Sequence, residues 1–376
     1  MIADSTVADA TVADSTVAPP DLRRLRTLAE VEAAAADRLD PVYRDFFAGG
    51  AGAERTLRDN LAAFDRRRVV PRVLRGVCAR DLSVRLLGAQ LSMPVLVAPT
   101  AFHRLAHPDG EAATARAATA AGTAMVVSMA ATTPIEEISA AAPGGPLWFQ
   151  LYLQPDLDFT VSVVRRAEAA GCLALVVTVD SPVFGHRLRD LRHGFTDLPA
   201  DLACENLRDR TGSVRDVAMD ATVGWDRIAW LRSVTPLPIV LKGVLHPRDA
   251  LLAVEHGVDG LLVSNHGGRQ LDGAVATIDA LPAVVAAVGG RLPVLLDGGV
   301  RRGVDVAVAL ALGASAVAVG RPVLWGLAAG GGAGVRHVLE LLRADLDHTM
   351  ALLGAARPAD LTGDGIRLTG PLSSLT

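Results

Sequence analysis

The sequence lacks closely spaced cysteines, an excess of positive charge, and any apolar run long enough to cross a membrane. It has three cysteines, Cys78, Cys172 and Cys204, which are far apart and show no CxxC spacing. This pattern argues for a reducing compartment and against a structural zinc site. Because no uninterrupted apolar stretch reaches the length of a bilayer span, we expect a soluble, cytoplasmic protein with no membrane partner.

The formal net charge is −4, which argues against a general nucleic-acid-binding role. Half of the residues are hydrophobic, so the chain can bury a substantial core. Residues 1–20 repeat an Ala-Asp-Ser-Thr-Val unit and contain neither basic residues nor the apolar core of a signal peptide. We therefore expect a disordered low-complexity tail at 1–20 and a single domain at 21–376.

From Pro94 onward, eight β-branched apolar runs alternate with alanine-rich amphipathic segments. Eight apolar strands, each followed by a helix, are typical of a parallel barrel buried on both faces. We predict an α/β fold, a (β/α)8 TIM barrel of roughly 250 residues. A doubly wound sheet is the alternative, but no GxGxxG follows the first strand. The predicted strands are 95–99, 124–129, 147–153, 173–180, 239–243, 260–265, 294–298 and 316–320; the predicted helices are 110–121, 134–142, 159–170, 225–234, 248–256, 278–288, 303–312 and 324–353.

Two segments fall outside this alternation. Residues 21–93 are predicted to form a helical and irregular segment that covers one end of the barrel. Residues 195–224, after the fourth strand, are rich in Asp and Arg and are long for a βα loop. Loops of this length are usually functional lids or disordered segments. We favour a lid-like insertion over the site.

Polar or glycine residues stand at the predicted C-terminal ends of all eight strands. In barrels of this kind the active site lies at those ends. Buried polar groups need partners, so we expect these residues to face a common ligand. They are Thr100, Ser128, Gln150, Tyr152, Thr178, Asp180, Lys242, Ser264, His266, Asp297, Gly320 and Arg321.

Glycine-rich segments at 297–301 and 320–322 follow the last two predicted strands. The loops after these strands form the recurrent phosphate site of the TIM barrel. Glycines let backbone N–H groups approach a phosphate closely, and Arg301 and Arg321 add bidentate positive charge. We interpret the two segments as a phosphate site; the alternative is a pair of tight turns with surface arginines.

His266 and Arg269 lie three residues apart, directly after an apolar strand. A base and an anion clamp on one turn can abstract a proton from a carboxylate-bearing substrate while holding its carboxylate. Lys242 ends another apolar strand and needs an anionic partner, because an unpaired buried ammonium is costly. It either forms a Schiff base or holds negative charge on a cofactor. Asp180 can pair with His266, orient it and raise its basicity.

Together these motifs resemble the FMN-dependent L-2-hydroxy acid oxidase and dehydrogenase family, which includes glycolate oxidase, lactate oxidase and mandelate dehydrogenase. The motifs follow the family's order and cover roughly residues 22 to 355. They lie at 98–101, 106–111, 149–152, 178–182, 241–243, 264–272, 297–301 and 320–322. The resemblance implies a TIM barrel that binds FMN and uses no metal.

The resemblance also implies roles in catalysis. Arg269 and Arg187 would hold the substrate carboxylate, Tyr152 would hydrogen-bond to the substrate, and His266 would be the base. Asp180 would support the imidazolium that forms. His266 would take the proton from the hydroxyl if a hydride moves, or from the α-carbon if a carbanion forms, and both routes stay open.

For the cofactor, the resemblance implies that Lys242 stabilises the negative charge of reduced FMN. The FMN phosphate would sit on the two glycine-rich segments, in agreement with their interpretation above. The other implied FMN contacts are Pro99, Thr100, Ala101, Ser128, Gln150, Thr178 and Ser264, with Asp297, Gly298, Gly299, Arg301, Gly320 and Arg321 at the phosphate.

Two positions depart from the family pattern. Phe46 stands where many members carry a tyrosine that reaches the substrate carboxylate, and Ala130 stands where glycolate oxidases carry a tryptophan. With Met129 and Phe184, these residues predict a roomy pocket for an aryl or large aliphatic side chain. The sequence is most similar to the actinobacterial hydroxymandelate oxidase branch, so we expect mandelate or 4-hydroxymandelate as substrate.

Ala101 favours an oxidase, because oxidases of the family tend to have alanine there and dehydrogenases often glycine. We predict an FMN-dependent (S)-2-hydroxy acid oxidase that yields a 2-keto acid and hydrogen peroxide. The alternatives are a dehydrogenase with another acceptor, an oxidase of aliphatic 2-hydroxy acids, an aldolase with Lys242 as Schiff-base former, and a non-catalytic flavin protein. The family suggests a homotetramer.

Overall fold

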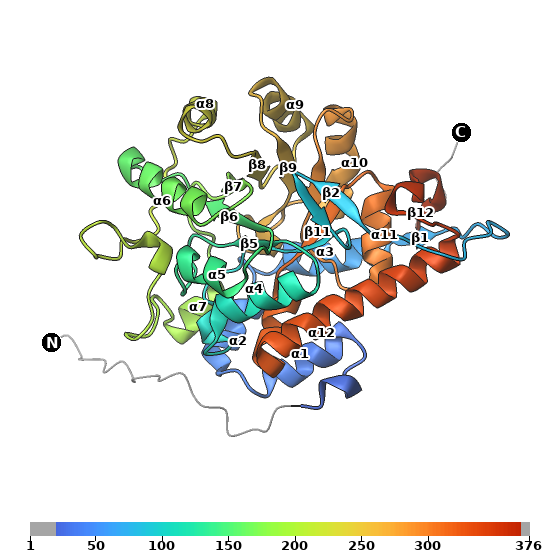
Figure 1. Cartoon of the computed structure of the whole chain (residues 1–376), viewed down its shortest axis with the longest axis horizontal. Helices are drawn as coiled ribbons and strands as arrows, with labels where there is room; N and C mark the ends of the chain where they lie inside the picture. Colours follow the sequence, from blue (N-terminus) through green and yellow to red (C-terminus); the bar gives the residue numbers. More distant parts are fainter. Residues whose placement is uncertain (1–19, 370–376) are drawn as a thin grey trace.

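The computed structural model describes residues 20–369, so the predicted tail lies outside the described residues except for Pro20. Eight parallel strands form a closed barrel in the order β10-β11-β4-β5-β6-β7-β8-β9 (Figure 1), which confirms the predicted TIM barrel. The strands are β4 (Val95–Val97), β5 (Met125–Val127), β6 (Leu147–Leu151), β7 (Leu175–Thr178), β8 (Ile239–Lys242), β9 (Gly260–Val263), β10 (Val294–Leu296) and β11 (Ala316–Val319).

The strand sequences are apolar throughout because both of their faces are buried. Alternate side chains point to opposite faces of a strand. Val126 and Val240 therefore pack inside the barrel, whereas Val127 and Leu241 pack toward the surrounding helices. Neighbouring strands are in register at the same level, for example Leu295 of β10 beside residue 262 of β9.

A helix follows each barrel strand and covers its outer face. In α6, Asp156 caps the N-terminus by accepting from the Phe159 N–H at 3.0 Å. Phe159, Val163 and Ala167 then recur at four-residue spacing on the buried side. These helices are α4 (Gly110–Ala120), α5 (Ile135–Ala141), α6 (Leu157–Ala169), α8 (Trp225–Val234), α9 (Pro247–Glu255), α10 (Thr277–Val288), α11 (Gly303–Ala311) and α12 (Arg321–Leu353).

Helix α12 begins three residues before the predicted start and is broken in the middle. Gly330 and Gly331 have non-helical backbone angles, with φ of +56° at Gly331. A Cβ at Gly326 would lie 2.6 Å from the Gly334 carbonyl oxygen, so the two halves approach backbone to backbone. The break separates a short first segment, which begins at Arg321 beside the barrel mouth, from a longer second segment.

The N-terminal segment covers both ends of the barrel, so the prediction that it covers one end is wrong. Its helices are α1 (Leu28–Ala36), α2 (Pro41–Ala48) and α3 (Arg55–Asp65), and its hairpin is β2 (Val84–Leu86) with β3 (Ala89–Leu91). Helix α1 packs on α12. Helices α2 and α3 lie at the C-terminal ends of the barrel strands, because α3 contacts the turn after β9. The β2–β3 hairpin precedes β4 directly and adds its apolar side chains to the barrel interior.

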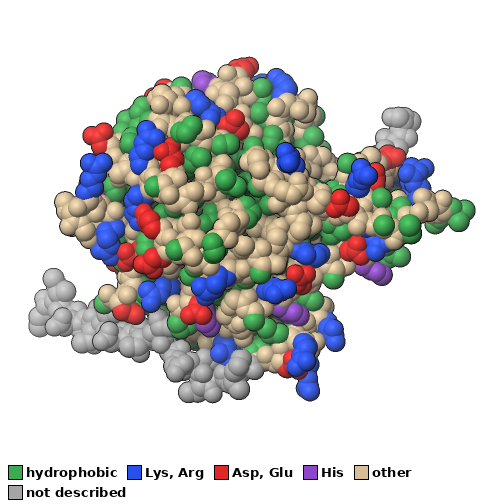
Figure 2. Space-filling view, viewed as in Figure 1, with side chains coloured by type: hydrophobic (Ala, Val, Ile, Leu, Met, Phe, Trp, Pro, Cys, Tyr) green, Lys and Arg blue, Asp and Glu red, His purple; other side chains and the backbone are tan. Residues whose placement is uncertain are grey.

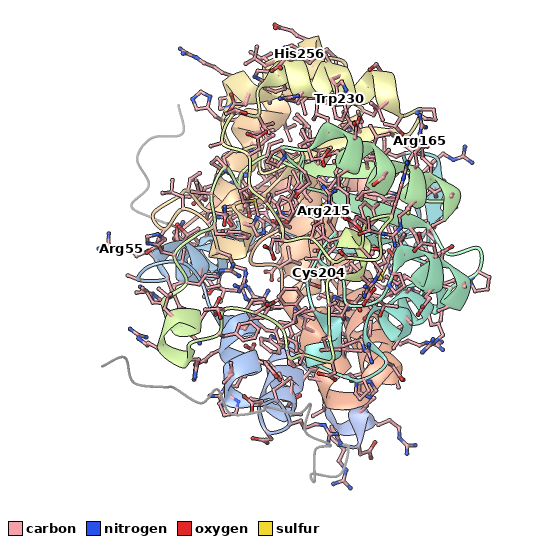
Figure 3. The ribbon with its side chains drawn as sticks, turned by 90° about the vertical axis from the view of Figure 1, so that its left-hand side faces the viewer. Arg55, Arg165, Cys204, Arg215, Trp230 and His256 are labelled. Carbon is pink, nitrogen blue, oxygen red and sulfur yellow. The ribbon has the colours of Figure 1, made fainter. Side chains whose placement is uncertain are left out.

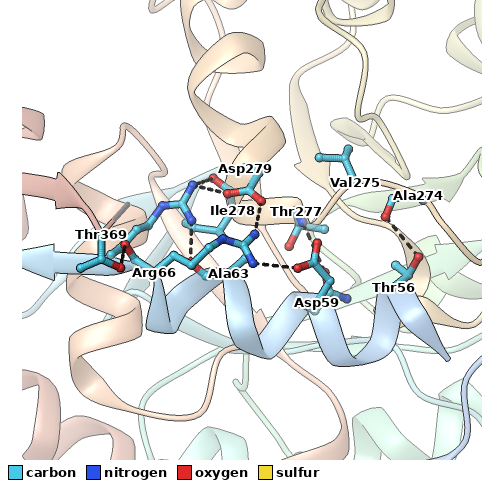
Figure 4. A network of polar contacts seen from close by, with 12 residues as sticks. Thr56, Asp59, Ala63, Arg66, Ala274, Val275, Thr277, Ile278, Asp279 and Thr369 are labelled. Carbon is cyan, nitrogen blue, oxygen red and sulfur yellow. Dashed lines mark hydrogen bonds and ion pairs between the residues drawn. The ribbon is translucent and has the colours of Figure 1, made fainter. Parts of the chain in front are cut away.

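Polar contacts fasten α3 to the barrel (Figure 4). The Thr56 hydroxyl donates to the Ala274 carbonyl at 3.1 Å, and Arg66 donates to Asp59 at 2.8 Å and to Asp279 at 2.7 Å. Near the C-terminus, β1 (Arg67–Val69) pairs antiparallel with β12 (Ile366–Leu368). The N-terminal segment is thus fixed on α10 and on the C-terminal strand, which holds the covering helices in place.

Helix α7 (Leu188–His193) follows β7 and precedes the predicted insertion at 195–224, which has little regular structure. In Figure 3 its residues Cys204 and Arg215 lie across the middle of the molecule. Arg215 forms an ion pair with Asp156 at 2.6 Å, and its guanidinium lies 4.4 Å from the Phe159 ring centroid. The insertion is therefore anchored on the N-terminal end of α6 by charge and cation–π contacts.

The surface in Figure 2 shows Lys and Arg side chains interspersed with Asp and Glu. A projecting arm on the right of Figures 1 and 2 includes β1 and the chain that follows it. Along this part of the chain Val73 and Leu74 are exposed. Within residues 20–369 no helix combines the length and the apolar character needed to cross a bilayer.

Candidate active site

A cavity of about 420 Å³ lies at the C-terminal ends of the barrel strands. Every residue predicted for the site lines it except Asp180, Ser264 and Met129. Sequence reasoning missed part of the wall, namely residues of α2, of the segments that follow β4, β7 and β9, and of the insertion. These additional lining residues include Phe47, Phe102, Ser181, Asp190, Phe195, Thr196, Asp197, Val217, Met219 and Gln270.

The strands change from apolar to polar at this end of the barrel. Side chains two residues apart on a strand point the same way. The polar residues at the mouth therefore continue the inward face of the barrel, each two positions after an apolar residue of the interior cluster. The pairs are Val126 and Ser128, Trp148 and Gln150, Val176 and Thr178, Val240 and Lys242, Leu262 and Ser264, and Leu295 and Asp297.

His266 is held beside Asp180, with 2.9 Å between Nδ1 and the carboxylate oxygen Oδ1. Its backbone has a φ of +60°, a left-handed conformation that is strained for a residue other than glycine. Ser264 helps to hold this turn, because its hydroxyl accepts from the His266 N–H at 3.0 Å. Ser264 is fully buried and does not line the cavity, and its direct contact with FMN stays a prediction.

Burial and the neighbouring Lys242 ammonium keep His266 neutral at neutral pH. Shielding from water and the neighbouring Lys242 ammonium lower the pKa of His266 below its ordinary value, and Asp180 offsets part of this effect. Burial alone would raise the pKa of Asp180, but Lys242 and His266 hold it well below the ordinary range. The pair is therefore a neutral imidazole on an ionised carboxylate, which is the state that a general base requires.

Lys242 ends β8 inside the mouth and is 3 % exposed. Its Nζ lies 3.9 Å from Asp180 Oδ2 and has no hydrogen-bond partner among residues 20–369. Oδ1 of Asp297 also lacks a partner there, and burial raises the pKa of Asp297. Buried polar atoms without partners are costly, so these atoms fit a polar ligand that supplies the missing hydrogen bonds.

Three further side chains form a hydrogen-bonded row on the cavity wall. The Gln150 amide donates to the Thr178 hydroxyl at 3.1 Å and accepts from the Ser128 hydroxyl at 3.3 Å and from the Met129 N–H at 3.1 Å. Tyr152 lies beyond them, and burial together with Asp180 raises the pKa of its phenol. Tyr152 therefore keeps its proton and can donate to a ligand.

Two arginines reach the cavity beside Phe46. Arg269 donates to the carbonyl oxygens of Phe46 at 2.6 Å and Gly49 at 3.0 Å. The guanidinium carbons of Arg269 and Arg187 lie 4.9 and 5.7 Å from the Phe46 ring centroid. Burial and the nearby Arg187 and Arg321 lower the pKa of Arg269 well below its ordinary value. Such an accumulation of positive charge favours an anionic ligand.

Phe46 belongs to an aromatic wall that joins three segments of the chain. Its ring stacks on Phe102 at 5.4 Å between centroids and meets Phe195 edge-on at 5.1 Å. Phe102 follows β4, and Phe195 belongs to the insertion. Met129, which was predicted to line the pocket, is fully buried, and its sulfur accepts from the Tyr152 N–H. Met129 therefore does not belong to the cavity wall, whose apolar part around Phe46 is aromatic.

The two glycine-rich segments meet at one side of the cavity. Gly298 and Gly299 have φ of +90° and +93°, and a Cβ at Gly299 would lie 2.2 Å from the Asn60 carbonyl oxygen. Glycine is therefore required at residue 299. Burial and Arg301 lower the pKa of Arg321 to about 10. Two buried guanidinium groups beside a glycine backbone that a ligand can approach closely fit the phosphate of FMN.

The comparisons identify the family. Residues 35–368 match the family model described as FMN-dependent dehydrogenase. The chain belongs to this family. It is 47% identical to an L-lactate oxidase from Nostoc sp., over 89% of this chain and 96% of that protein. It is 48% identical to human 2-hydroxyacid oxidase 1, over 89% of this chain and 94% of that protein.

Among solved structures, a mandelate oxidase variant with (S)-mandelic acid matches with a TM-score of 0.85 and 44% identity, over 92% of this chain and 99% of that one. A mandelate oxidase with benzoyl-formic acid also matches with a TM-score of 0.85, at 45% identity over 91% and 98% of the two chains. The predicted family, the FMN cofactor and the enzyme class are confirmed. The roles of individual site residues stay predictions.

Proposed function

We propose that the protein oxidises aryl (S)-2-hydroxy acids such as mandelate or 4-hydroxymandelate, with oxygen as the electron acceptor. The overall reaction converts the hydroxy acid and oxygen into a 2-keto acid and hydrogen peroxide. The observation that carries the proposal is the aromatic wall around Phe46, which lines the same cavity as Arg187, Arg269 and His266, the partner of Asp180.

The substrate carboxylate binds Arg269 and Arg187, which fixes the orientation of the α-carbon. A bound anion relieves the repulsion that lowers the pKa of Arg269. The Tyr152 phenol donates a hydrogen bond to the substrate, because its raised pKa keeps it protonated. Positioning of this kind contributes a large part of the rate in a reaction between bound groups.

His266 then removes a proton from the bound substrate. The neutral imidazole accepts this proton, and the charge that develops is stabilised by the Asp180 carboxylate at 2.9 Å. FMN, when bound, supplies the acceptor for the two electrons. Lys242 and Gln150 would hold its ring, and Arg301 and Arg321 with the glycines of their segments would hold its phosphate.

An aryl substrate is supported by the size and character of the pocket. Ala130 and Phe184 line the cavity together with the phenylalanines of the aromatic wall. Aromatic rings pack well on one another at centroid distances of about 4.5–7 Å. The solved mandelate oxidases support the same assignment. The lactate oxidase and 2-hydroxyacid oxidase relatives support the alternative, an aliphatic substrate.

Anaerobic titration of the FMN-bound protein with (S)-mandelate, followed by air, tests both the substrate and the acceptor. We expect the yellow absorbance to bleach with mandelate and to recover quickly in air. Slow recovery would indicate a dehydrogenase with another acceptor. Absorbance that bleaches with lactate but not with mandelate would contradict the aryl assignment.

The variant Ala130→Trp tests whether the side-chain pocket lies at Ala130. An indole there removes volume that a phenyl ring needs but a methyl group does not, so kcat/KM should fall much more for mandelate than for lactate. Lactate serves as the control for damage to the fold. Equal losses for both substrates would mean that Ala130 does not face the substrate side chain.

We also propose a cytoplasmic location and a homotetrameric state. Both rest on the sequence and on the family rather than on contacts within this single chain. Light scattering of the purified protein measures the oligomeric state directly, and a monomeric mass would contradict it.

A further inference from the structure

His103 is a fully buried histidine that the proposed mechanism does not use. Its Nε2 lies 2.6 Å from the hydroxyl oxygen of Thr100, and its Nδ1 lies 2.9 Å from the hydroxyl oxygen of Thr114. Thr100 lines the active-site cavity, whereas His103 and Thr114 lie behind it. A chain of three hydrogen-bonding groups thus runs from α4 to the cavity wall.

His103 is neutral in this position. Burial lowers its pKa, and the nearby Glu111 opposes this only in part. The Glu111 carboxylate is occupied by other donors: the His103 backbone N–H at 3.1 Å, Thr132 at 2.8 Å and the Thr133 hydroxyl at 2.9 Å. It therefore does not pair with the imidazole ring. A neutral imidazole has one nitrogen that donates and one that accepts.

The hydroxyl of Thr114 sets the direction of the chain. It can donate to the Gly110 carbonyl one helical turn earlier, at 3.3 Å, which leaves its oxygen to accept from His103. The Thr114 oxygen then accepts from Nδ1–H, which leaves Nε2 of His103 as the acceptor. The Thr100 hydroxyl must donate to Nε2, and only its oxygen lone pairs are left for the cavity.

We propose that His103 is a positioning residue that holds the Thr100 hydroxyl as a hydrogen-bond acceptor on the wall of the FMN site. A wall that accepts favours a ligand form with more N–H donors. The flavin ring gains an N–H donor at N5 on reduction, so a Thr100 oxygen facing that donor would favour reduced over oxidised FMN. The inference rests on the FMN-dependent family and not on the identity of the substrate.

The first experiment reads the tautomer of His103 directly. Nitrogen NMR of the protein labelled at histidine distinguishes a ring protonated at Nδ1 from one protonated at Nε2, and the His103→Gln variant assigns the signal. We expect the Nδ1–H form in the FMN-bound protein. An Nε2–H form would overturn the proposal, since Thr100 would then be free to donate into the cavity.

The second experiment measures the reduction potential of bound FMN by photoreduction, without any hydroxy acid. His103→Leu and the isosteric Thr114→Val should each weaken the preference for reduced over oxidised FMN by about five-fold, which is ~20 mV toward more negative potential. His103→Gln still offers a carbonyl acceptor to Thr100, and Thr114→Ser keeps the hydroxyl. Both variants should therefore have the wild-type potential. Unchanged potentials in both loss variants would overturn the proposal.

A double-mutant cycle separates positioning from a general effect on the fold. If His103 acts through Thr100, the shift in Thr100→Val with His103→Leu should equal that of Thr100→Val alone. Additive shifts would mean that His103 acts independently of Thr100. These readouts need no substrate, so they stay informative if the aryl assignment fails.

Discussion

The two ends of the barrel differ in what their side chains do. At the N-terminal end, Leu86 and Leu91 of the β2–β3 hairpin join the fully apolar interior cluster. At the C-terminal end, the buried charges of Lys242 and Asp180 lie 3.9 Å apart, and Asp180 also contacts the neutral His266 ring. Apolar packing at the N-terminal end stabilises the fold. At the C-terminal end, some buried polar atoms gain hydrogen-bond partners only when a ligand binds. Stability and chemistry are therefore assigned to opposite ends of the same strands.

The change occurs within two residues of a strand. In β8, Val240 packs inside the barrel, and Lys242 on the same face reaches the cavity. The left-handed backbone at His266 is found at the polar end as well. The fold tolerates the strained backbone and the unpaired charge at this end because the apolar packing inside the barrel stabilises the same strands.

The largest effect is expected from removing the base at the polar end. His266→Ala should lower kcat by about 10²- to 10⁴-fold, because among residues 20–369 no other histidine lines the cavity. FMN should stay bound and thermal stability should change little. Stopped-flow measurement of flavin bleaching checks the rate. His256→Ala, at an exposed ring stacked on Trp225, is the matched control and should keep normal turnover. Normal bleaching in His266→Ala would remove its assignment as the base.

The converse is expected at the apolar end. Leu91 is fully buried in the hairpin, so Leu91→Ala should lower the free energy of unfolding by about 2–5 kcal/mol. Below the unfolding transition, kcat and KM should equal those of the wild type. Leu352→Ala, at an exposed position of α12, is the control and should cost about 0.5 kcal/mol or less. A kinetic defect in Leu91→Ala would show that the two ends are coupled.

Most of the barrel could be predicted from the sequence, because buried parallel strands are short apolar runs with clear boundaries. The predicted strand at 239–243 corresponds to β8 and the predicted helix at 225–234 coincides with α8. The polar mouth followed from reading the residues at the strand ends. The two-residue period of a strand would also have shown that Val240 and Lys242 both face the barrel interior.

Other features depend on contacts between distant segments. Phe46, Phe102 and Phe195 are separated by many residues, and no local pattern indicates that their rings meet. The break in α12 at Gly330 and Gly331 depends on backbone contact between its halves, which a helical periodicity does not encode. The division of the N-terminal segment between both ends of the barrel depends likewise on tertiary packing.

The smallest effect concerns pH and tests how strongly Lys242 acts on His266. The catalytic form of His266 is the neutral one, so kcat/KM should rise with pH as the imidazolium loses its proton. Because burial and Lys242 lower the pKa of His266, this rise should be centred below the ordinary value of about 6.5. Asp180→Asn removes the group that raises this pKa, so the rise should move to still lower pH while kcat falls. Tyr152→Phe should leave the position of the rise unchanged. A rise centred above pH 6.5 in the wild type would mean that Asp180 outweighs Lys242 and burial at His266.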